Sequence, residues 1–367
     1  MTARVERFRS ELAEAGFDGA IVSRPEHVFY LCGYAAPVRG LTYLVVGPRG
    51  VGLVTSGKGA EIPGEPEIQV FSYEYYRPTQ LRDVDEASLE ALAAGISTVG
   101  LRGVRTGVED SYLSARAFQS LVSVCDAVSL GGLIERMRLR KDENEIAAIR
   151  RAVSINDRGL TVAQRVIAPG VSELEVYAAI YREVLLSHGA PYTLRGDFVS
   201  GARTERIGGP PSSRVLEEGD LFIIDIFPVL DWYKGDFTRN FVVGKPNARQ
   251  LEVHRVLEDA LAAGAAVIRP GIRACDLDAV VRESVTAAGY GAYFPHHSGH
   301  AIGLDHPEPP YIIPADPTPL QSRMVITLEP GIYIPGFGGM RLEQNFLVTD
   351  TGAEPLSSYP LKLIPCG

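Results

Sequence analysis

Apolar positions near the start of the chain follow two spacings, and each spacing predicts a different element. Three of them lie three and four residues apart: Val5, Phe8 and Leu12. This spacing predicts an amphipathic helix, which Gly16 ends. The apolar run at 19–23 predicts a strand, and residues 42–56 predict two strands around a Gly-Pro-Arg-Gly turn. We therefore expect residues 1–132 to form a small α/β domain.

A longer helical pattern begins at Asp142. Its side chain and that of Glu145, three residues later, form a capping pair. Apolar residues then follow at helical spacing: Ile146, Ile149 and Val153. We place the domain boundary before this helix, so that residues 133–367 form a second domain. Two domains also suit a chain of 367 residues, because single cores rarely grow past about 250–300 residues.

The second domain contains an internal repeat. The sequence VIAPG at 166–170 recurs as VIRPG at 267–271, 101 residues later. Each copy ends a predicted helix and is followed by a second predicted helix. Five residues alone could match by coincidence, but the shared helix–loop–helix context favours a duplicated half-domain. We expect such a duplicated unit to build its site where the two halves meet.

Composition and charge exclude several classes of protein. The formal net charge is −9 and no stretch is rich in lysine or arginine, so nucleic acid and anionic membranes are not expected as partners. No run of about 18 apolar residues predicts a membrane span, and the N-terminal segment lacks the apolar core of a signal peptide. The four cysteines are far apart and fit neither a disulfide framework nor a zinc ribbon. We therefore expect a protein of the reducing cytoplasm.

Two acidic residues lie on a predicted hairpin of the first half. Asp225 stands within an apolar strand, where an ionised carboxylate is unfavourable unless it is paired or bound to a metal. Opposite residues of an antiparallel pair have a constant index sum, so a turn centred near residues 230–231 brings Asp225 opposite Asp236. A cation would relieve their repulsion. The alternative is that Asp225 ends a strand and Asp236 is a solvated turn residue.

The second half repeats this arrangement with two glutamates. The midpoint of Glu329 and Glu343 is Gly336, which lies in a predicted turn, and apolar neighbours draw Glu343 inward. Shifting the two aspartates by 101 residues gives 326 and 337, close to the two glutamates. Two hairpins at equivalent places in the two halves therefore each present two carboxylates, which favours a functional site over the solvated alternative.

Four carboxylates and one histidine would form an oxygen and nitrogen shell that suits two divalent ions. Iron–sulfur and structural zinc sites would need thiolates instead. Four of the chain's seven histidines lie between residues 294 and 310: His296, His297, His300 and His306. Because a lone histidine is more often a surface or a core residue, we do not expect most of these four to be ligands.

Several motifs, taken together and in this order, resemble the pita-bread metallopeptidase family, which includes Xaa-Pro dipeptidases (prolidases), Xaa-Pro aminopeptidases and methionine aminopeptidases. They are Asp225 with Asp236-Phe-Thr-Arg239, His296-x-x-Gly299-His300 followed by Ile302-Gly303-Leu304, Thr327-Leu328-Glu329-Pro330-Gly331-Ile332-Tyr333, and Arg341-Leu342-Glu343. The sequence AGFDGAIVSRPEHVFYLCGY resembles the creatinase-type N-terminal domain of the Xaa-Pro-cleaving members. Methionine aminopeptidases lack that domain, which argues against them. The resemblance covers essentially the whole chain.

The resemblance implies a metal site and a set of residues around it. The implied ligands are Asp225, Asp236, His300, Glu329 and Glu343. Of these, Asp236 and Glu343 would bridge the two ions, and Glu329 would also carry a proton to the leaving nitrogen. The resemblance also implies that His296 contacts substrate and stabilises the tetrahedral intermediate. His297 has no derived role, and a structural or solvent-facing position is expected.

Two residues beside the ligand positions, Tyr333 and Arg341, are predicted to bind substrate or to orient Glu343, with a structural role as the alternative. The implied fold is an α/β creatinase-like domain (1–132) followed by an α+β pita-bread catalytic domain with an internal pseudo-two-fold repeat (133–367). The N-terminal domain would cap the cleft and help to form a homodimer.

The implied reaction is hydrolysis of the Xaa-Pro bond in dipeptides or short proline-containing peptides, with two ions of manganese, cobalt or zinc. A water shared by the ions would lose a proton and attack the amide as the bridging hydroxide. Two other enzymatic hypotheses are an Xaa-Pro aminopeptidase acting on longer peptides and a hydrolase or lyase of non-peptide amides. A silent binding module is a further hypothesis, which predicts the loss of ligands, and none is lost.

Three departures from the family pattern concern the substrate pocket. Phe227 stands where the family often has glycine, and Gly208 stands where members commonly have a substrate-contacting histidine. His306 lies one residue earlier than the family's histidine and is predicted to bind substrate. None of these departures changes a predicted metal ligand, so they bear on the substrate rather than on hydrolysis.

Overall fold

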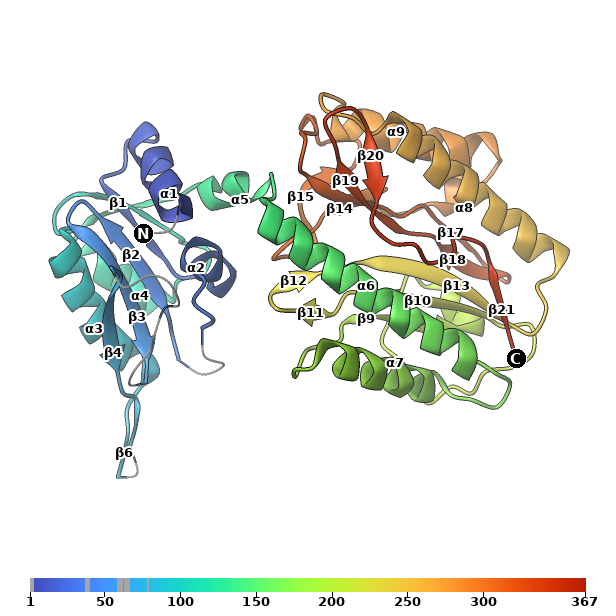
Figure 1. Cartoon of the computed structure of the whole chain (residues 1–367), viewed down its shortest axis with the longest axis horizontal. Helices are drawn as coiled ribbons and strands as arrows, with labels where there is room; N and C mark the ends of the chain where they lie inside the picture. Colours follow the sequence, from blue (N-terminus) through green and yellow to red (C-terminus); the bar gives the residue numbers. More distant parts are fainter. Residues whose placement is uncertain (1–2, 37–39, 58–61, 63–66, 78) are drawn as a thin grey trace. The chain divides into compact units, whose positions relative to one another are not determined.

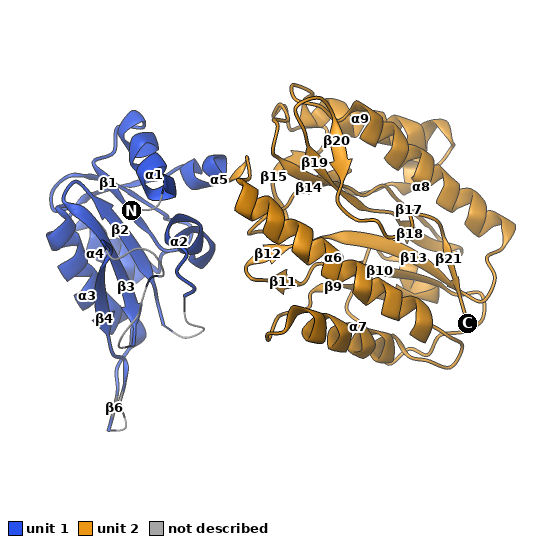
Figure 2. Cartoon of the chain, in the orientation of Figure 1, with its two compact units in different colours: residues 1–137 blue, residues 138–367 orange. Residues whose placement is uncertain are grey.

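The computed structural model describes residues 3–36, 40–57, 62, 67–77 and 79–367. The chain divides into two compact units, residues 1–137 and 138–367 (Figure 2). The predicted boundary lies five residues earlier, at the start of helix α5 (Leu133–Arg138). That residues 1–132 and 133–367 are separate domains stays a prediction.

Unit 1 is an α/β unit built on a mixed six-stranded sheet in the order β4-β3-β2-β1-β7-β8. Its strands are β1 (Gly19–Val22), β2 (Tyr43–Gly47), β3 (Gly50–Ser56), β4 (Gln69–Tyr73), β7 (Arg105–Val108) and β8 (Asp126–Ser129), with a separate ladder of β5 (Tyr76–Arg77) and β6 (Gln80–Leu81). Its helices before α5 are α1 (Ala3–Glu14), α2 (Pro25–Cys32), α3 (Val84–Val99) and α4 (Ala115–Val122).

The elements predicted in unit 1 are confirmed. Helix α1 buries the predicted apolar stripe and packs against α2 and β1. Strands β2 and β3 pair antiparallel around the predicted turn, with Gly47 opposite Gly50.

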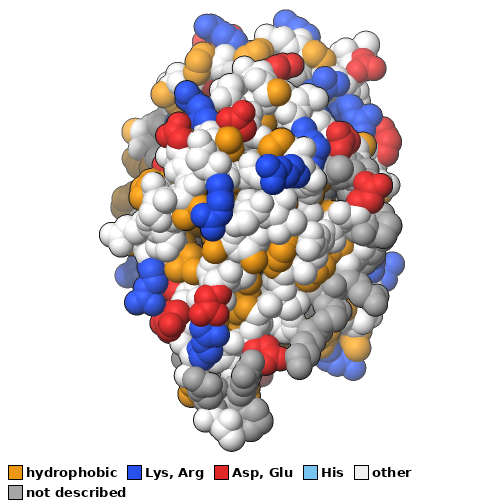
Figure 3. All heavy atoms as spheres, turned by 90° about the vertical axis from the view of Figure 1, so that its left-hand side faces the viewer, with side chains coloured by type: hydrophobic (Ala, Val, Ile, Leu, Met, Phe, Trp, Pro, Cys, Tyr) orange, Lys and Arg blue, Asp and Glu red, His pale blue; other side chains and the backbone are white. Residues whose placement is uncertain are grey.

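On the face shown in Figure 3, lysine and arginine side chains lie among aspartate and glutamate side chains, so neither sign of charge dominates that face.

Unit 2 contains two larger sheets and four long helices, whose arrangement Figure 1 shows. One sheet has the order β21-β13-β10-β9, made of β9 (Gly196–Ser200), β10 (Leu221–Ile226), β13 (Phe237–Val243) and β21 (Ile364–Cys366). The other has the order β15-β14-β16-β19-β20, made of β14 (Gly299–Ala301), β15 (Glu308–Ile312), β16 (Val325–Leu328), β19 (Gln344–Val348) and β20 (Ala353–Pro355). Two short ladders join β11 (Val229–Leu230) to β12 (Tyr233–Lys234) and β17 (Gly331–Ile334) to β18 (Gly338–Arg341).

The helices of unit 2 confirm the internal repeat. They are α6 (Glu143–Val166), α7 (Glu173–His188), α8 (Ala248–Val267) and α9 (Ala274–Ala287). Helices α6 and α8 end 101 residues apart, and α7 and α9 begin 101 residues apart. In Figure 1, α7 lies on one side of the strands, and α8 and α9 lie on the opposite side. The predicted capping pair at the start of α6 is also present, because Asp142 and Glu145 each bond to the other's backbone N–H.

The predicted register of the first hairpin is wrong by two residues. Strands β10 and β13 place Asp225 opposite Thr238 and not opposite Asp236. The turn is centred on Asp231 and Trp232, which both adopt positive φ (48° and 74°), as the commonest two-residue hairpin turn requires. A shift of two residues preserves the face of a strand, because side chains alternate with a period of two. Asp225 and Asp236 therefore still lie on one face.

The predicted centre of the second hairpin is confirmed. Strands β17 and β18 pair around Gly336, with Ile334 opposite Gly338. Strands β16 and β19 continue the same register on the far side of the two predicted glutamates. Glu329 and Glu343 lie where the ladder passes from one sheet to the next, and both are buried.

Within the described residues, no helix combines the length and the apolar character that crossing a membrane requires.

Candidate metal centre

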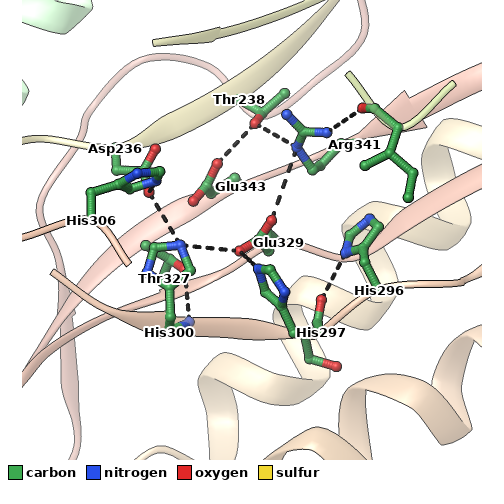
Figure 4. A network of polar contacts seen from close by, with 12 residues as sticks. Asp236, Thr238, His296, His297, His300, His306, Thr327, Glu329, Arg341 and Glu343 are labelled. Carbon is green, nitrogen blue, oxygen red and sulfur yellow. Dashed lines mark hydrogen bonds and ion pairs between the residues drawn. The ribbon is translucent and has the colours of Figure 1, made fainter. Parts of the chain in front are cut away.

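The structure brings all five predicted ligands together from both halves of unit 2. Asp225 lies in β10 and Asp236 immediately precedes β13, whereas His300 lies in β14. The two glutamates follow β16 and β18. Ligand atoms of Asp225, Asp236 and Glu343 lie within 4.8 Å of one another, as do ligand atoms of His300 with Glu329 and His297. Figure 4 shows the side chains of Asp236, His300, Glu329 and Glu343 pointing into one common space.

Several oxygens of the buried carboxylates in this cluster lack donors. Among the described residues, none donates a hydrogen bond to one oxygen each of Asp225 and Glu343 or to either oxygen of Asp236. Buried ionised carboxylates without partners are strongly unfavourable. Burial, followed by repulsion from neighbouring carboxylates, raises the pKa of Asp236 and of Glu343 well above the ordinary values. Divalent cations are the partners that this oxygen-rich donor set fits, and they would keep these groups ionised.

His300 presents a lone pair to the same space. Its Nδ1 donates to the carbonyl oxygen of Ala301 at 3.0 Å, which leaves Nε2 as the unprotonated nitrogen. That Nε2 lies 3.4 Å from Oδ2 of Asp236 and 3.4 Å from Oε1 of Glu329. Burial lowers the pKa of His300 to about 4, so the imidazole is neutral, as a metal ligand must be.

His297 lies in the cluster, although it had no role in the sequence-based prediction, which expected a structural or solvent-facing position. Its Nε2 lies 2.9 Å from Oε1 of Glu329. Burial raises the pKa of Glu329, but His297 and the neighbouring imidazoles outweigh burial and lower that pKa to about 2. The sequence signal for His297 was only its place in the histidine cluster.

His306 and Phe227, two departures from the family pattern, contact each other. Their rings stack with centroids 3.9 Å apart, and His306 Nε2 lies 2.8 Å from Oδ2 of Asp236. Phe227 therefore packs against His306, the histidine that lies one residue earlier than in the family pattern. Ligand atoms of His306, His300 and Asp236 form another group within 4.8 Å.

His296 and Tyr333 form a polar pair at the edge of the cluster. Nδ1 of His296 donates to the carbonyl oxygen of His297 at 2.8 Å, and its Nε2 lies 3.0 Å from the Tyr333 hydroxyl. Burial lowers the pKa of His296 to about 4, so its ring is neutral and Nε2 accepts from the hydroxyl. Burial also raises the pKa of Tyr333 to about 12, which keeps that hydroxyl protonated.

All five N–H groups of Arg341 are engaged within the protein. Nε donates to Thr238 Oγ1 at 3.0 Å, and Nη1 donates to the Ile207 carbonyl at 2.6 Å and to the Tyr333 hydroxyl at 3.2 Å. Nη2 donates to Asp197 at 2.8 Å and to Asp225 at 2.7 Å. These contacts favour a role for Arg341 in orienting its neighbours. Binding of substrate by Arg341 stays a prediction.

Arg341 also orients Glu343. Thr238 accepts from Arg341 and donates to Oε2 of Glu343 at 2.8 Å, so the guanidinium fixes that glutamate through one hydroxyl. The remaining oxygen, Oε1, is the one without a donor among the described residues. Arg341 therefore holds Asp225 directly and Glu343 indirectly.

A pocket of about 190 Å³ opens onto the cluster. Besides the cluster and Arg341, its walls include Asp197, Ile207, Phe227 and Pro307. Asp197 was missed by sequence reasoning. It lies in β9 directly opposite Asp225 of β10, and only the pairing of these two strands reveals that it shares the site. The volume is below the roughly 300–1,000 Å³ of pockets for drug-sized ligands, which suits a small substrate.

Comparison with known proteins agrees with this geometry. Residues 147–350 match metallopeptidase family M24, and residues 4–140 match the creatinase/prolidase N-terminal domain. The chain is 30% identical to the Xaa-Pro dipeptidase of Pyrococcus furiosus, over 99% of this chain and 100% of that protein.

Several solved structures have the same architecture along almost the whole chain. An Xaa-Pro dipeptidase from Bacillus anthracis is 27% identical, with a TM-score of 0.87 and coverage of 99% of both chains. An X-Pro aminopeptidase from Thermotoga maritima is 25% identical, with a TM-score of 0.85 and coverage of 98% of this chain and 99% of that chain.

The fold of two duplicated halves encloses a cluster of buried carboxylates and imidazoles, and family models match residues 4–140 and 147–350. Together these observations define a metallopeptidase. The chain belongs to metallopeptidase family M24. The predicted fold, a creatinase-like N-terminal domain followed by a pita-bread catalytic domain with an internal repeat, is confirmed.

Proposed function

We propose that this protein hydrolyses the Xaa-Pro bond of dipeptides and other short peptides, using two divalent metal ions. The observation that carries this proposal is the cluster of buried carboxylate oxygens without donors beside a pocket of about 190 Å³. The residues that would hold the ions are Asp225, Asp236, His300, Glu329 and Glu343, and of these Asp236 and Glu343 would be shared by both ions. The names of the relatives from Pyrococcus furiosus and Bacillus anthracis support the substrate class.

The ions, when bound, supply a water of lowered pKa and positive charge for the developing oxyanion. The chain supplies orientation and proton transfer. Glu329 accepts a proton and passes it to the leaving imino nitrogen. His296 contacts the substrate and, together with Tyr333, stabilises the tetrahedral intermediate, because the Tyr333 hydroxyl can turn its proton from His296 Nε2 toward the oxyanion. His306 and Arg341 complete the proposed substrate-binding set, with Arg341 acting through the residues that it orients.

We also propose manganese, cobalt or zinc as the metal, because all three accept carboxylate and imidazole ligands. The proposed setting is a homodimer in the cytoplasm. The free cysteines and the acidic charge balance support the cytoplasm, and the N-terminal domain, taken as residues 1–132, is the proposed dimerisation element.

An Xaa-Pro aminopeptidase acting on longer peptides is the second candidate. The likeness to the solved X-Pro aminopeptidase of Thermotoga maritima favours it, and the small pocket volume favours the dipeptidase. A non-peptide amide is the third, and the altered residues Phe227, Gly208 and His306 favour it.

Metal-reconstituted protein assayed with Ala-Pro, Ala-Pro-Ala and Ala-Ala separates these candidates. Cleavage of Ala-Pro alone supports the dipeptidase, and cleavage of Ala-Pro-Ala supports the aminopeptidase. Inactivity on all three, with metal bound, would reject both and favour the non-peptide substrate.

A further inference from the structure

Asp197 places a carboxylate in the pocket wall beside the metal cluster. It lies in β9, and its side chain is 29% exposed, whereas the cluster carboxylates are buried. Oδ1 accepts from the backbone N–H of Gly209 at 2.8 Å, and Oδ2 accepts from Nη2 of Arg341 at 2.8 Å. Each oxygen has one such partner, so each keeps acceptor capacity toward the pocket.

Gly208 makes room for this carboxylate. A Cβ atom added at Gly208 would lie 2.1 Å from Oδ2 of Asp197, far inside van der Waals contact. A side chain at 208 would therefore force the carboxylate of Asp197 to move from its bonds to Gly209 and Arg341. With glycine at 208, the pocket wall at this place presents the acceptor oxygens of Asp197.

The charges around the pocket leave no cation to receive an anionic group at this wall. Among the described lining residues, Arg341 is the one lysine or arginine, and all five of its N–H groups are engaged. Arg341 is shared between Asp197 and Asp225, so one guanidinium faces two carboxylates at this wall. The wall therefore offers acceptor oxygens of Asp197 but no free lysine or arginine donor among the described lining residues.

We propose that Asp197 determines specificity by binding a positively charged group of the substrate, an alkylammonium or a guanidinium. This inference rests on the proposed function. Such a group can come from a lysine or arginine side chain of residue Xaa or from the peptide's α-amino terminus. A charge-assisted hydrogen bond to a partly exposed carboxylate supports roughly a tenfold preference over a neutral group of similar size.

The test compares substrate preferences of the wild type with those of Asp197→Asn, which removes the charge but keeps the shape. Lys-Pro against Met-Pro probes the side-chain source, and Ala-Pro against propionyl-proline probes the α-amino source. A ratio of kcat/KM values from one preparation does not depend on its active fraction. Asp197→Ala is measured alongside, and metal content and thermal unfolding verify that each variant is folded and loaded.

One of the two preferences is expected to fall about tenfold in Asp197→Asn, and which one falls identifies the source of the charge. If both ratios match those of the wild type, the inference is overturned, even where all rates fall together, because a uniform loss means only that Asp197 orients Arg341. Asp231→Asn, which removes an exposed acid from the β11–β12 turn, is the matched control and should leave both ratios unchanged. If the wild type cleaves no Xaa-Pro dipeptide at all, the proposed function fails instead.

Discussion

Arg341 in β18 donates a hydrogen bond of 2.7 Å from Nη2 to Oδ2 of Asp225 in β10. This contact joins a side chain of the second half to one of the first half, across the place where the two duplicated units meet. It leaves Oδ1 of Asp225 without a donor among the described residues. The arginine therefore fixes the direction in which the proposed ligand presents its second oxygen.

Arg341→Lys should weaken both the fold and the catalyst. One ammonium has three donors and cannot replace five in a planar arrangement, so buried acceptors lose their partners. We expect a loss of unfolding free energy on the order of 2 kcal/mol and a fall in kcat of at least about tenfold. Urea unfolding and steady-state kinetics measure these effects. Arg214→Lys, at an ion pair with Asp220 away from the pocket, is the control, and equal effects in both variants would contradict the special role of Arg341.

Asp236→Asn should reduce the metal content to one ion or none and abolish activity. An amide offers one weak oxygen ligand where the carboxylate offers two, so it cannot bridge two cations. Metal analysis after dialysis and an Xaa-Pro assay provide the measurements. Two bound ions with normal turnover in this variant would disprove the bridging role.

Gly208→Ala should disturb the pocket through Asp197, because the new Cβ would lie 2.1 Å from that carboxylate. The single variant is expected to lower both stability and kcat/KM. Asp197→Ala removes the obstacle, so Gly208→Ala should cost less stability in the Asp197→Ala background than in the wild type. A double-mutant cycle of unfolding free energies should give a coupling of at least about 1 kcal/mol. Strict additivity would contradict the proposed steric conflict between a side chain at 208 and the carboxylate of Asp197.

Glu308→Gln should change the pH dependence of stability. Lys141 Nζ lies 2.6 Å from Oε1 of Glu308, and Arg138 Nη2 lies 2.5 Å from Oε2. Burial raises the pKa of Glu308, but these two cations outweigh burial and lower it. A depressed folded pKa stabilises the protein above the unfolded value of about 4.3, and this stabilisation is lost as the pH falls through the folded pKa.

The expected loss in Glu308→Gln is therefore about 3 kcal/mol at pH 7, where the variant leaves buried Lys141 without its carboxylate and Arg138 with Asp305 alone. The difference from the wild type should shrink below about pH 4, because the wild-type glutamate also becomes neutral. Urea unfolding at pH 7, 5 and 3.5 provides the measurement. A difference that does not change with pH would mean that packing, and not charge, explains the loss.

Much of this fold could be predicted from sequence because the deciding signals are local. The spacing of Val5, Phe8 and Leu12 located one helix, and the cap formed by Asp142 and Glu145 located the start of another. The duplicated VIAPG and VIRPG segments located the two halves correctly. The register of the first hairpin failed because the turn is centred on Asp231 and Trp232, and Trp at positive φ is not a residue that signals this turn.

The roles around the pocket needed the fold. Asp197 is far from every motif and shares the site only because β9 pairs with β10. The engagement of all five Arg341 donors depends on Ile207 and Thr238, which no spacing rule connects to it. His297 contacts Glu329 because of the path of one loop. Long-range pairing of this kind leaves no periodic trace in a single sequence.

The most direct test of the account is a crystal structure of the protein grown with manganese and measured at a wavelength where manganese scatters anomalously. We predict two anomalous peaks, about 3.5–4 Å apart, enclosed by Asp225, Asp236, His300, Glu329 and Glu343. Manganese peaks elsewhere, or none within ligand distance of these five side chains, would contradict the proposed dinuclear centre.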